Sequence, residues 1–412
     1  MTARIAFVGD GATGPVPPSS PDVEVRVLDP QSLQVEHVLG ADGLWAAAGG
    51  PAVERAADTL RSAGVPVGGV VAGAPPWPGP GLDPRFVDAA RSRAVWREQA
   101  EAAARTRTEE RAALETAEAE PRPYVHQMRG PRHRWWRPVL WLLLVVVLYV
   151  LVNTWLGVVV LLAGVDPATL LESVDSPSSL LVLNGLLIVL IPVTLVASGV
   201  AHWRSPWRVL SVAGRLRWGW LARCLLLVTP LWALYLAGSW VVFDQEVLPR
   251  TSDWVWLVVV ALLTTPLQSA AEELFFRGGL VQAVGSWFRR PVLALVVTTV
   301  VSTAAFAAAH GSADPWILTE LASLGVLGCY LAWRTGGLEA AIALHVVNNV
   351  LITVSGAVLG GLGDSYIDTT TTGSPLSALM SWVVTVVAVV VILWHGRRKG
   401  VVPRGWLTPA RG

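Results

Sequence analysis

The stretch that decides the fold is PVLWLLLVVVLYVLVNTWLGVVVLL, residues 138–162, which contains no Asp, Glu, Lys or Arg. A helix rises 1.5 Å per residue, so about 20 apolar residues cross the ~30 Å hydrocarbon core of a bilayer. Seven more apolar stretches of similar length follow it: residues 179–200, 220–243, 254–272, 291–310, 315–333, 337–359 and 376–394. The sequence therefore predicts an all-α polytopic membrane protein with eight transmembrane helices over residues 137–400.

The composition of the whole chain agrees with this prediction. Of its 412 residues 53% are hydrophobic and only 15% are charged, whereas about 25% are charged in an ordinary soluble domain. Residues 1–127 carry 17 acids and 12 bases, and residues 128–412 carry 13 acids and 19 bases. This pattern excludes a single soluble globule, a disordered chain and a nucleic-acid-binding protein built on a basic surface.

The loop charges predict the orientation of the spans. Basic residues gather before the first span, in every second loop and in the tail: Arg129, Arg132, Arg134, Arg137, Arg204, Arg208, Arg215, Arg217, Arg223, Arg277, Arg289, Arg290, Arg334, Arg397, Arg398 and Lys399. The intervening loops hold one base, Arg250. By the positive-inside rule both termini are expected in the cytoplasm, with the protein in the cell membrane. A single Lys among 31 basic residues suggests a bacterial genome rich in GC.

Residues 1–82 are expected to form a small α/β cytoplasmic domain, followed by a helical linker over residues 83–136; residues 401–412 are a cytoplasmic tail. The elements expected in the first domain are strands at Arg4–Val8, Val23–Leu28 and Val67–Val71 and a helix at Pro51–Ala63. Gly9–Gly14 fits the GxGxxG pattern of dinucleotide-binding folds, but prolines at positions 15, 17, 18 and 21 forbid the helix that must follow. No nucleotide cofactor is therefore expected.

Few ionisable residues lie within the apolar stretches, and such residues indicate function by default because they are costly in hydrocarbon. Glu273 and Arg277 are four residues apart, so they share a helix face and can pair. Glu272 points about 100° away, so its carboxylate is free to act as a general base. His345 and Asn349 share a face in the seventh stretch, as do Phe306 and His310 in the fifth.

Together these residues could activate a water molecule and stabilise the oxyanion of peptide-bond hydrolysis. The alternative is that they only hold helices together, since buried ion pairs and intramembrane His and Asn side chains often do so. The protein would then be a non-catalytic immunity or scaffold factor.

Three motifs resemble those of the CPBP intramembrane proteases, which include the CAAX prenyl endopeptidases and bacteriocin-processing or self-immunity proteins. Glu272–Arg277 matches EExxxR, Phe306–His310 matches FxxxH, and His345–Asn349 matches HxxxN, in this order within residues 254–355. The resemblance implies an intramembrane endopeptidase that acts on a membrane-associated or lipid-modified protein or peptide. Residues 254–355 would form the protease core.

The resemblance also implies roles for individual residues. Glu272 is expected to be the catalytic glutamate and His310 to help it position water, with His345 and Asn349 stabilising the oxyanion. Glu273, Arg277 and Phe306 would support them. The family has been interpreted both as glutamate-dependent and as metal-dependent, so the expected cofactor is either none or a divalent metal such as zinc. On the second interpretation Glu272, His310 and His345 are the candidate ligands.

The depths of these residues need reconciling. Glu272 lies near the inner end of its stretch, whereas His310 follows Arg290 by 20 residues, about 30 Å of helix. A shared site therefore requires the fourth transmembrane helix to be long, tilted or kinked.

Overall fold

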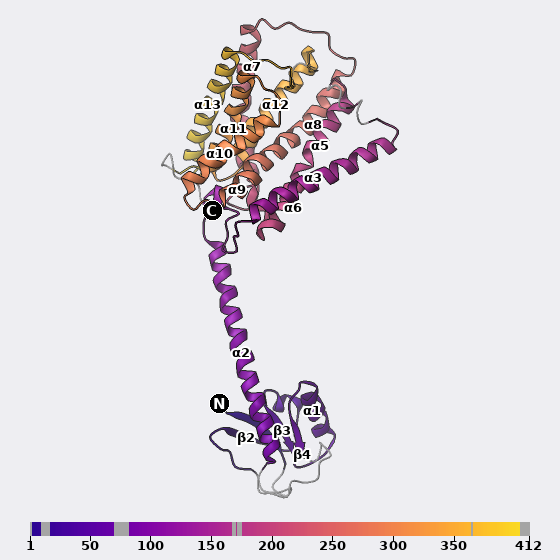
Figure 1. Cartoon of the computed structure of the whole chain (residues 1–412), viewed down its shortest axis with the longest axis vertical. Helices are drawn as coiled ribbons and strands as arrows, with labels where there is room; N and C mark the ends of the chain where they lie inside the picture. Colours follow the sequence, from indigo (N-terminus) through magenta and orange to yellow (C-terminus); the bar gives the residue numbers. More distant parts are fainter. Residues whose placement is uncertain are drawn as a thin grey trace. The chain divides into compact units, whose positions relative to one another are not determined.

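The protein is described from a computed structural model covering residues 2–9, 17–69, 82–166, 170, 175–363 and 366–403. The chain divides into two compact units, Met1–Thr116 and Ala117–Gly412 (Figure 1). Residues 10–14 of the GxGxxG segment lie outside the described residues, as do the last two residues of the strand expected at Val67–Val71.

The first unit is built on a parallel sheet with strand order β2-β1-β3-β4. Its elements are β1 (Ala3–Val8), β2 (Val23–Leu28), the 3-10 helix η1 (Val35–Val38), β3 (Gly43–Ala46), α1 (Pro51–Ser62) and β4 (Val67–Gly69). The sequence did not indicate β3, which pairs with β1 from Ile5↔Gly43 onward. This strand has four residues, three of them buried, and strands buried on both faces lack the alternation that reveals a strand.

The helix α2 (Pro84–Ala119) begins against this sheet. Phe86, Ala90 and Ala94 are its buried residues, and they join one apolar cluster with Ala3 and Ile5 of β1. The helix therefore contributes its first three turns to the core of the first unit.

The second unit contains eight helices that are long and apolar enough to cross a membrane, counted over the described residues. They are α3 (Arg137–Leu162), α5 and α6 (Pro177–Ile188 and Leu190–His202), α7 (Trp218–Val242), α8 with η5 and α9 (Trp254–Glu273, Leu274–Leu280 and Val281–Gly285), α10 (Pro291–Ala308), α11 (Pro315–Thr335), α12 (Glu339–Leu359) and α13 (Pro375–Arg398). The prediction of an eight-span helical membrane protein with a small N-terminal α/β region is thus confirmed.

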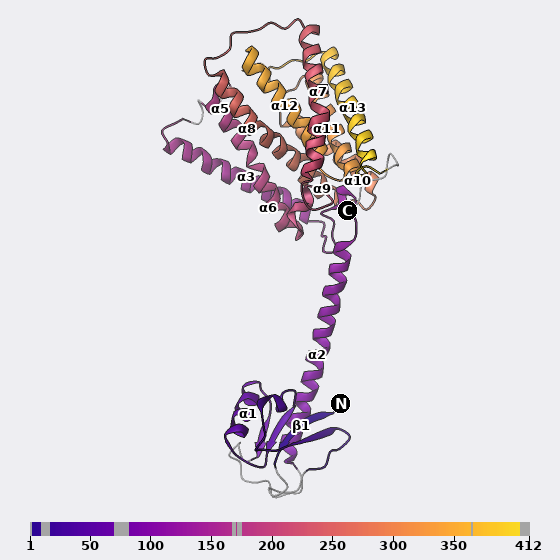
Figure 2. The ribbon, with the colours of Figure 1, turned by 180° about the vertical axis from the view of Figure 1, so that it is seen from behind.

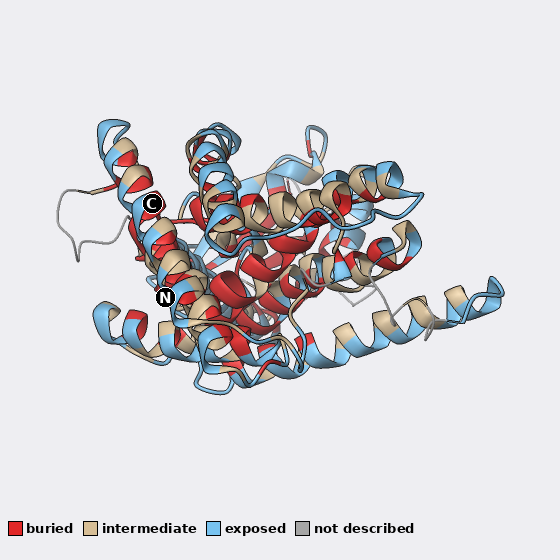
Figure 3. Ribbon diagram, turned by 90° about the horizontal axis from the view of Figure 1, so that it is seen from above, coloured by how far each residue is buried: buried red, intermediate tan, exposed pale blue. Residues whose placement is uncertain are grey.

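Helix α12 is the centre of this bundle. It packs against α7, α8 and α11, while α11 also contacts α10 and α13. The helix α3 runs obliquely to α7 and α13 (Figures 1 and 2) and packs against α6. Buried residues gather inside the bundle, and the outer helix faces are exposed (Figure 3). The residues of α8 and α12 that were singled out from the sequence therefore lie in the interior.

The fourth span is long, as a shared site requires. It runs from Trp254 to Gly285, 32 residues, and Pro266 lies within α8 without ending it. The irregularity comes at η5, a π-helical segment that begins directly after Glu273. Such segments widen a helix locally and occur frequently at functional sites. The long span carries Glu272 inward from the membrane surface, so the depth conflict disappears.

The part of the second unit that precedes the first span also packs into the bundle. The short 3-10 helix η3 (Tyr124–His126) is buried, and Tyr124 and Met128 belong to the main apolar cluster of the bundle. The Tyr124 hydroxyl donates to the Val209 carbonyl over 2.6 Å. The segment just before the first span is therefore packed structure.

Candidate active site

The structure brings all seven residues singled out from the sequence into one connected group. Glu272 and Glu273 end α8, Arg277 lies in η5, and His345 and Asn349 lie in α12. Phe306 lies in α10, and His310 follows two residues after that helix ends. Three of the spans therefore meet at this point.

The two adjacent glutamates have different surroundings. Glu273 Oε1 lies 2.9 Å from Arg277 Nη1 and 2.9 Å from His345 Nδ1. The side chains of Glu273 and Arg277 are 3% and 0% exposed. Glu273 is therefore an internal counter-ion with two basic partners, and the ion pair expected from the four-residue spacing is present.

Glu272 makes no contact with the arginine. Its Oε1 accepts a hydrogen bond from Gln268 Nε2 over 2.6 Å, one turn earlier in α8. Its Oε2 has no hydrogen-bond partner within the described parts of the chain and lies 3.7 Å from His345 Nε2. One oxygen of this carboxylate is thus held in place, and the other is available.

The contacts of the two histidines determine which ring nitrogen carries hydrogen. A carboxylate only accepts, so His345 Nδ1 donates to Glu273, and Nε2 of the neutral ring carries the lone pair. This nitrogen lies 3.2 Å from Asn349 Nδ2, which can donate to it. In the same way His310 Nδ1 donates to the Phe306 carbonyl over 2.8 Å. Each histidine therefore presents an Nε2 that can accept.

A chain of donors from α7 orients the Asn349 amide. Trp232 Nε1, which can only donate, lies 3.0 Å from Asn348 Oδ1, and Asn348 Nδ2 donates to Asn349 Oδ1 over 2.9 Å. Asn349 Nδ2 is thereby turned toward His345 and toward Gln268 Oε1, 3.3 Å away. The Trp232 indole therefore sets the direction of every later donor in the chain.

Sequence reasoning missed Gln268, Trp232 and Asn348. Two of them carried a signal, because Gln268 precedes Glu272 by one helical turn and Asn348 is adjacent to Asn349. Trp232 carried none, since it is one of 21 tryptophans and its role depends on a contact between distant helices.

Phe306 lies at the centre of the group. Its ring centroid is 4.7 Å from the His310 ring and 5.6 Å from the His345 ring, both edge to face. The Arg277 guanidinium lies 4.0 Å from the ring centroid on its face, a favourable cation–π geometry. His310 is also close enough to Glu272 for electrostatic interaction. Phe306 thus connects the α10 segment with the glutamates and α12.

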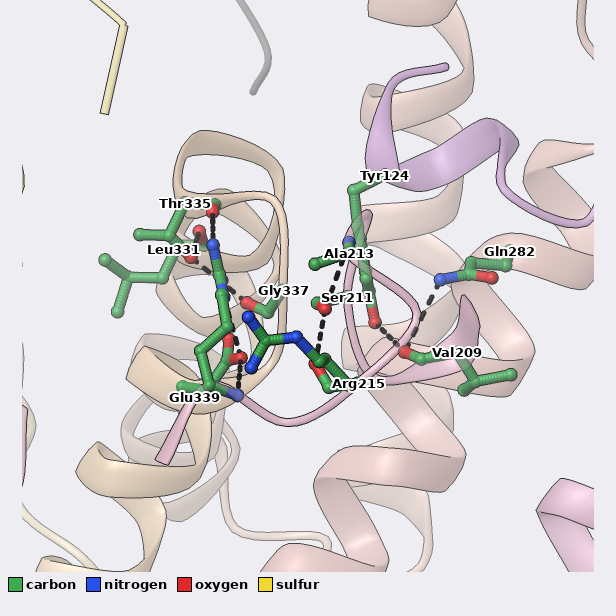
Figure 4. A network of polar contacts seen from close by, with 11 residues as sticks. Tyr124, Val209, Ser211, Ala213, Arg215, Gln282, Leu331, Thr335, Gly337 and Glu339 are labelled. Atoms are coloured by element: carbon green, nitrogen blue, oxygen red, sulfur yellow. Dashed lines mark hydrogen bonds and ion pairs between the residues drawn. The ribbon is translucent and has the colours of Figure 1, made fainter. Parts of the chain in front are cut away.

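The start of α12 is anchored by a second buried ion pair. Glu339 is 0% exposed, and its two oxygens accept from the Arg217 side chain over 2.8 and 2.6 Å. Figure 4 shows this end of the bundle, where Tyr124 and Gln282 both donate to the Val209 carbonyl. His345 lies six residues beyond Glu339, so this pair limits how far the active-site end of α12 can shift.

The donor set does not form a ready metal site. Among the residues that the structure describes, no three His, Cys, Asp or Glu side chains converge closely enough to hold a metal ion. His345 Nε2 instead faces the Asn349 amide. The candidate ligands Glu272, His310 and His345 therefore do not fit a metal in this arrangement.

Comparisons with known proteins agree with the motifs. Residues 251–351 match the family described as type II CAAX prenyl endopeptidase, Rce1-like. The uncharacterized protein YyaK of Bacillus subtilis (strain 168) is 31% identical over 157 residues, 36% of this chain and 52% of that protein. The chain thus spans about half the length of this curated relative. No solved structure matches the chain. The segment that carries all three motifs, residues 251–351, therefore belongs to the CAAX-protease-like (CPBP) family.

Proposed function

We propose that this protein is an intramembrane endopeptidase that hydrolyses a peptide bond in a membrane-associated or lipid-modified protein or peptide. The observation that carries the proposal is the contrast between the adjacent glutamates. Glu273 is neutralised by Arg277, whereas Glu272 has one held oxygen and one available oxygen facing His345. The contrast lies in the partners: Glu273 faces a guanidinium, whereas Glu272 faces only the Gln268 amide and the His345 imidazole.

Glu272 and His310 would activate the water. The Nε2 of His310 accepts one water hydrogen and aligns the oxygen, while Glu272 Oε2 accepts the other hydrogen as a proton. The water oxygen then bonds to the scissile carbonyl carbon. When the C–N bond breaks, the proton passes from Glu272 to the leaving amide nitrogen, so the glutamate is regenerated.

Asn349 would donate from Nδ2 to the oxyanion that forms on the carbonyl oxygen. His345 would add a second donor while the proton that Glu272 took from water resides on its Nε2, 3.7 Å from Glu272 Oε2. Glu273 would then stabilise the charged ring through its contact with Nδ1. The same proton would return through Glu272 to the leaving nitrogen. Glu273, Arg277 and Phe306 are positioning residues in this mechanism.

The test is cleavage of a membrane-peptide library by the purified full-length protein in lipid vesicles, comparing wild type with Glu272→Gln. The matched control is Glu320→Gln, the same change at a half-buried glutamate of α11. Loss of cleavage in Glu272→Gln alone supports the proposal, and a parallel assay with a chelator tests the need for a metal. Equal cleavage by wild type and Glu272→Gln would refute Glu272 as the base and leave the non-catalytic alternative.

We further infer from the loop charges that both termini are cytoplasmic and that substrate is reached from that side. Cysteine labelling of variants in loops between spans, using a reagent that cannot cross the membrane, tests the orientation. Labelling at the basic loops from outside intact cells would contradict it.

A further inference from the structure

A second polar cluster lies where α6 ends and α3 begins. Arg137, His202 and Arg204 are 4%, 2% and 7% exposed, and the half-buried His133 adjoins them. Arg137 Nη1 donates to the His202 carbonyl over 2.7 Å, which joins the two helices. His202 interacts electrostatically with the other three side chains. Four basic side chains thus converge in a largely buried position.

Most of the nitrogen atoms in this cluster have no hydrogen-bond partner within the described residues. These atoms are Nδ1 and Nε2 of His202, Nε and Nη1 of Arg204, Nε of Arg137 and Nδ1 of His133. Leaving the buried guanidinium donors of Arg137 and Arg204 unpaired is unfavourable. The arginines of this cluster therefore lack an anionic partner in the described chain, whereas Arg277 in the candidate active site lies 2.9 Å from Glu273.

In the described parts of the chain no carboxylate lies within ion-pair distance of Arg137 or Arg204. Glu118, the acid near Arg204, lies 3.9 Å from Arg132 instead. Burial and the neighbouring arginines lower the pKa of Arg204 to about 10. A bound anion would offset both effects.

Exposed tryptophans place the cluster at the membrane surface. The Arg204 guanidinium packs against Gly130, where a Cβ would lie 2.2 Å from Nη1. Trp135 and Trp203 are exposed beside the cluster, and the Arg137 guanidinium lies 4.8 Å from the Trp203 ring centroid. Tryptophan is typical of the layer where lipid head groups lie.

We propose that Arg137, His202, Arg204 and His133 bind a phosphate group at the membrane surface, as carried by an anionic phospholipid or by free phosphate. Arginine forks match phosphate oxygens, and imidazole nitrogens add further donors. Basic pockets between transmembrane helices are suited to anionic head groups. This site is independent of the proposed peptidase activity.

The experiment measures lipid binding to delipidated full-length protein in detergent by native mass spectrometry. The probes are phosphatidylglycerol, diacylglycerol with the same chains but no phosphate, and inorganic phosphate. We expect wild type to bind phosphatidylglycerol at least about tenfold more tightly than diacylglycerol, and Arg204→Gln to lose this preference. Binding of inorganic phosphate at a concentration similar to that of phosphatidylglycerol would identify free phosphate as the ligand. Binding of neither phosphate compound would overturn the proposal.

Arg223→Gln is the matched control, since it removes the same charge from an exposed position at the start of α7. It should retain the preference, and equal losses in Arg204→Gln and Arg223→Gln would mean that general surface charge is responsible. If Arg204→Gln does not insert normally, His133→Gln tests the site instead, because the half-buried His133 side chain can be replaced without disturbing the packing of the core. We expect it to weaken phosphatidylglycerol binding several-fold, and unchanged binding would contradict the site.

Discussion

Two nearly isosteric substitutions at adjacent glutamates should differ widely in their effect on stability. Glu273→Gln removes the counter-ion of Arg277, whose side chain is 0% exposed. Breaking a buried pair in this way costs about 3–5 kcal/mol, because the remaining charge stays buried without compensation. Among the described residues no arginine or lysine pairs with Glu272, whose Oε2 lies 3.7 Å from His345 Nε2. Glu272→Gln should therefore change the free energy of unfolding by less than about 1 kcal/mol.

The assay is reversible unfolding of the purified protein in mixed micelles by titration with a denaturing detergent, which reports the free energy of unfolding. A double variant, Glu273→Gln with Arg277→Met, should recover much of the lost stability, since replacing both members of a buried pair by groups of similar volume is often neutral. Equal losses in the two single variants, or no recovery in the double variant, would refute the assignment of Glu273 as the internal counter-ion.

Three further predictions follow from the packing. Trp232→Phe removes the donor that orients the Asn348 and Asn349 amides. Because one lost hydrogen bond costs about 1–1.5 kcal/mol, kcat/KM should fall about tenfold while membrane insertion stays normal. Unchanged kinetics would contradict the donor chain. Deleting residues 1–116 should leave cleavage of a peptide substrate intact, whereas deleting residues 1–127 also removes buried Tyr124 and should lower thermal stability; equal stability of both truncations would argue against this packing. Burial and a neighbouring arginine lower the pKa of His126 to about 4 from 6.5, so its neutral form stabilises the fold above pH 6.5 and stability is lost as the pH falls toward 4. His126→Gln should flatten this part of a stability profile, and an unaltered profile would exclude His126 as its source.

The sequence by itself determined those features that depend on neighbouring residues along the chain. Each span is recognised because apolar length must match bilayer thickness, which is a local property. The Glu273–Arg277 pair follows from a four-residue spacing within one helix, and the three motifs indicated the family over residues 251–351. The first unit was predictable to the same extent, apart from β3, which is too short and too buried to show a strand pattern.

Only the tertiary structure decided which residues meet across helices. Placing His310 by counting 1.5 Å per residue put it at a different depth from Glu272, because counting ignores helix tilt and the π-helical segment after Glu273. The role of Trp232 and the convergence of Arg137, His202 and Arg204 were invisible for the same reason, since the residues that meet are far apart in the chain. The hydrophobic effect places apolar segments in the membrane but does not distinguish one arrangement of spans from another. That choice depends on close packing and buried hydrogen bonds, which exist only once the helices have come together.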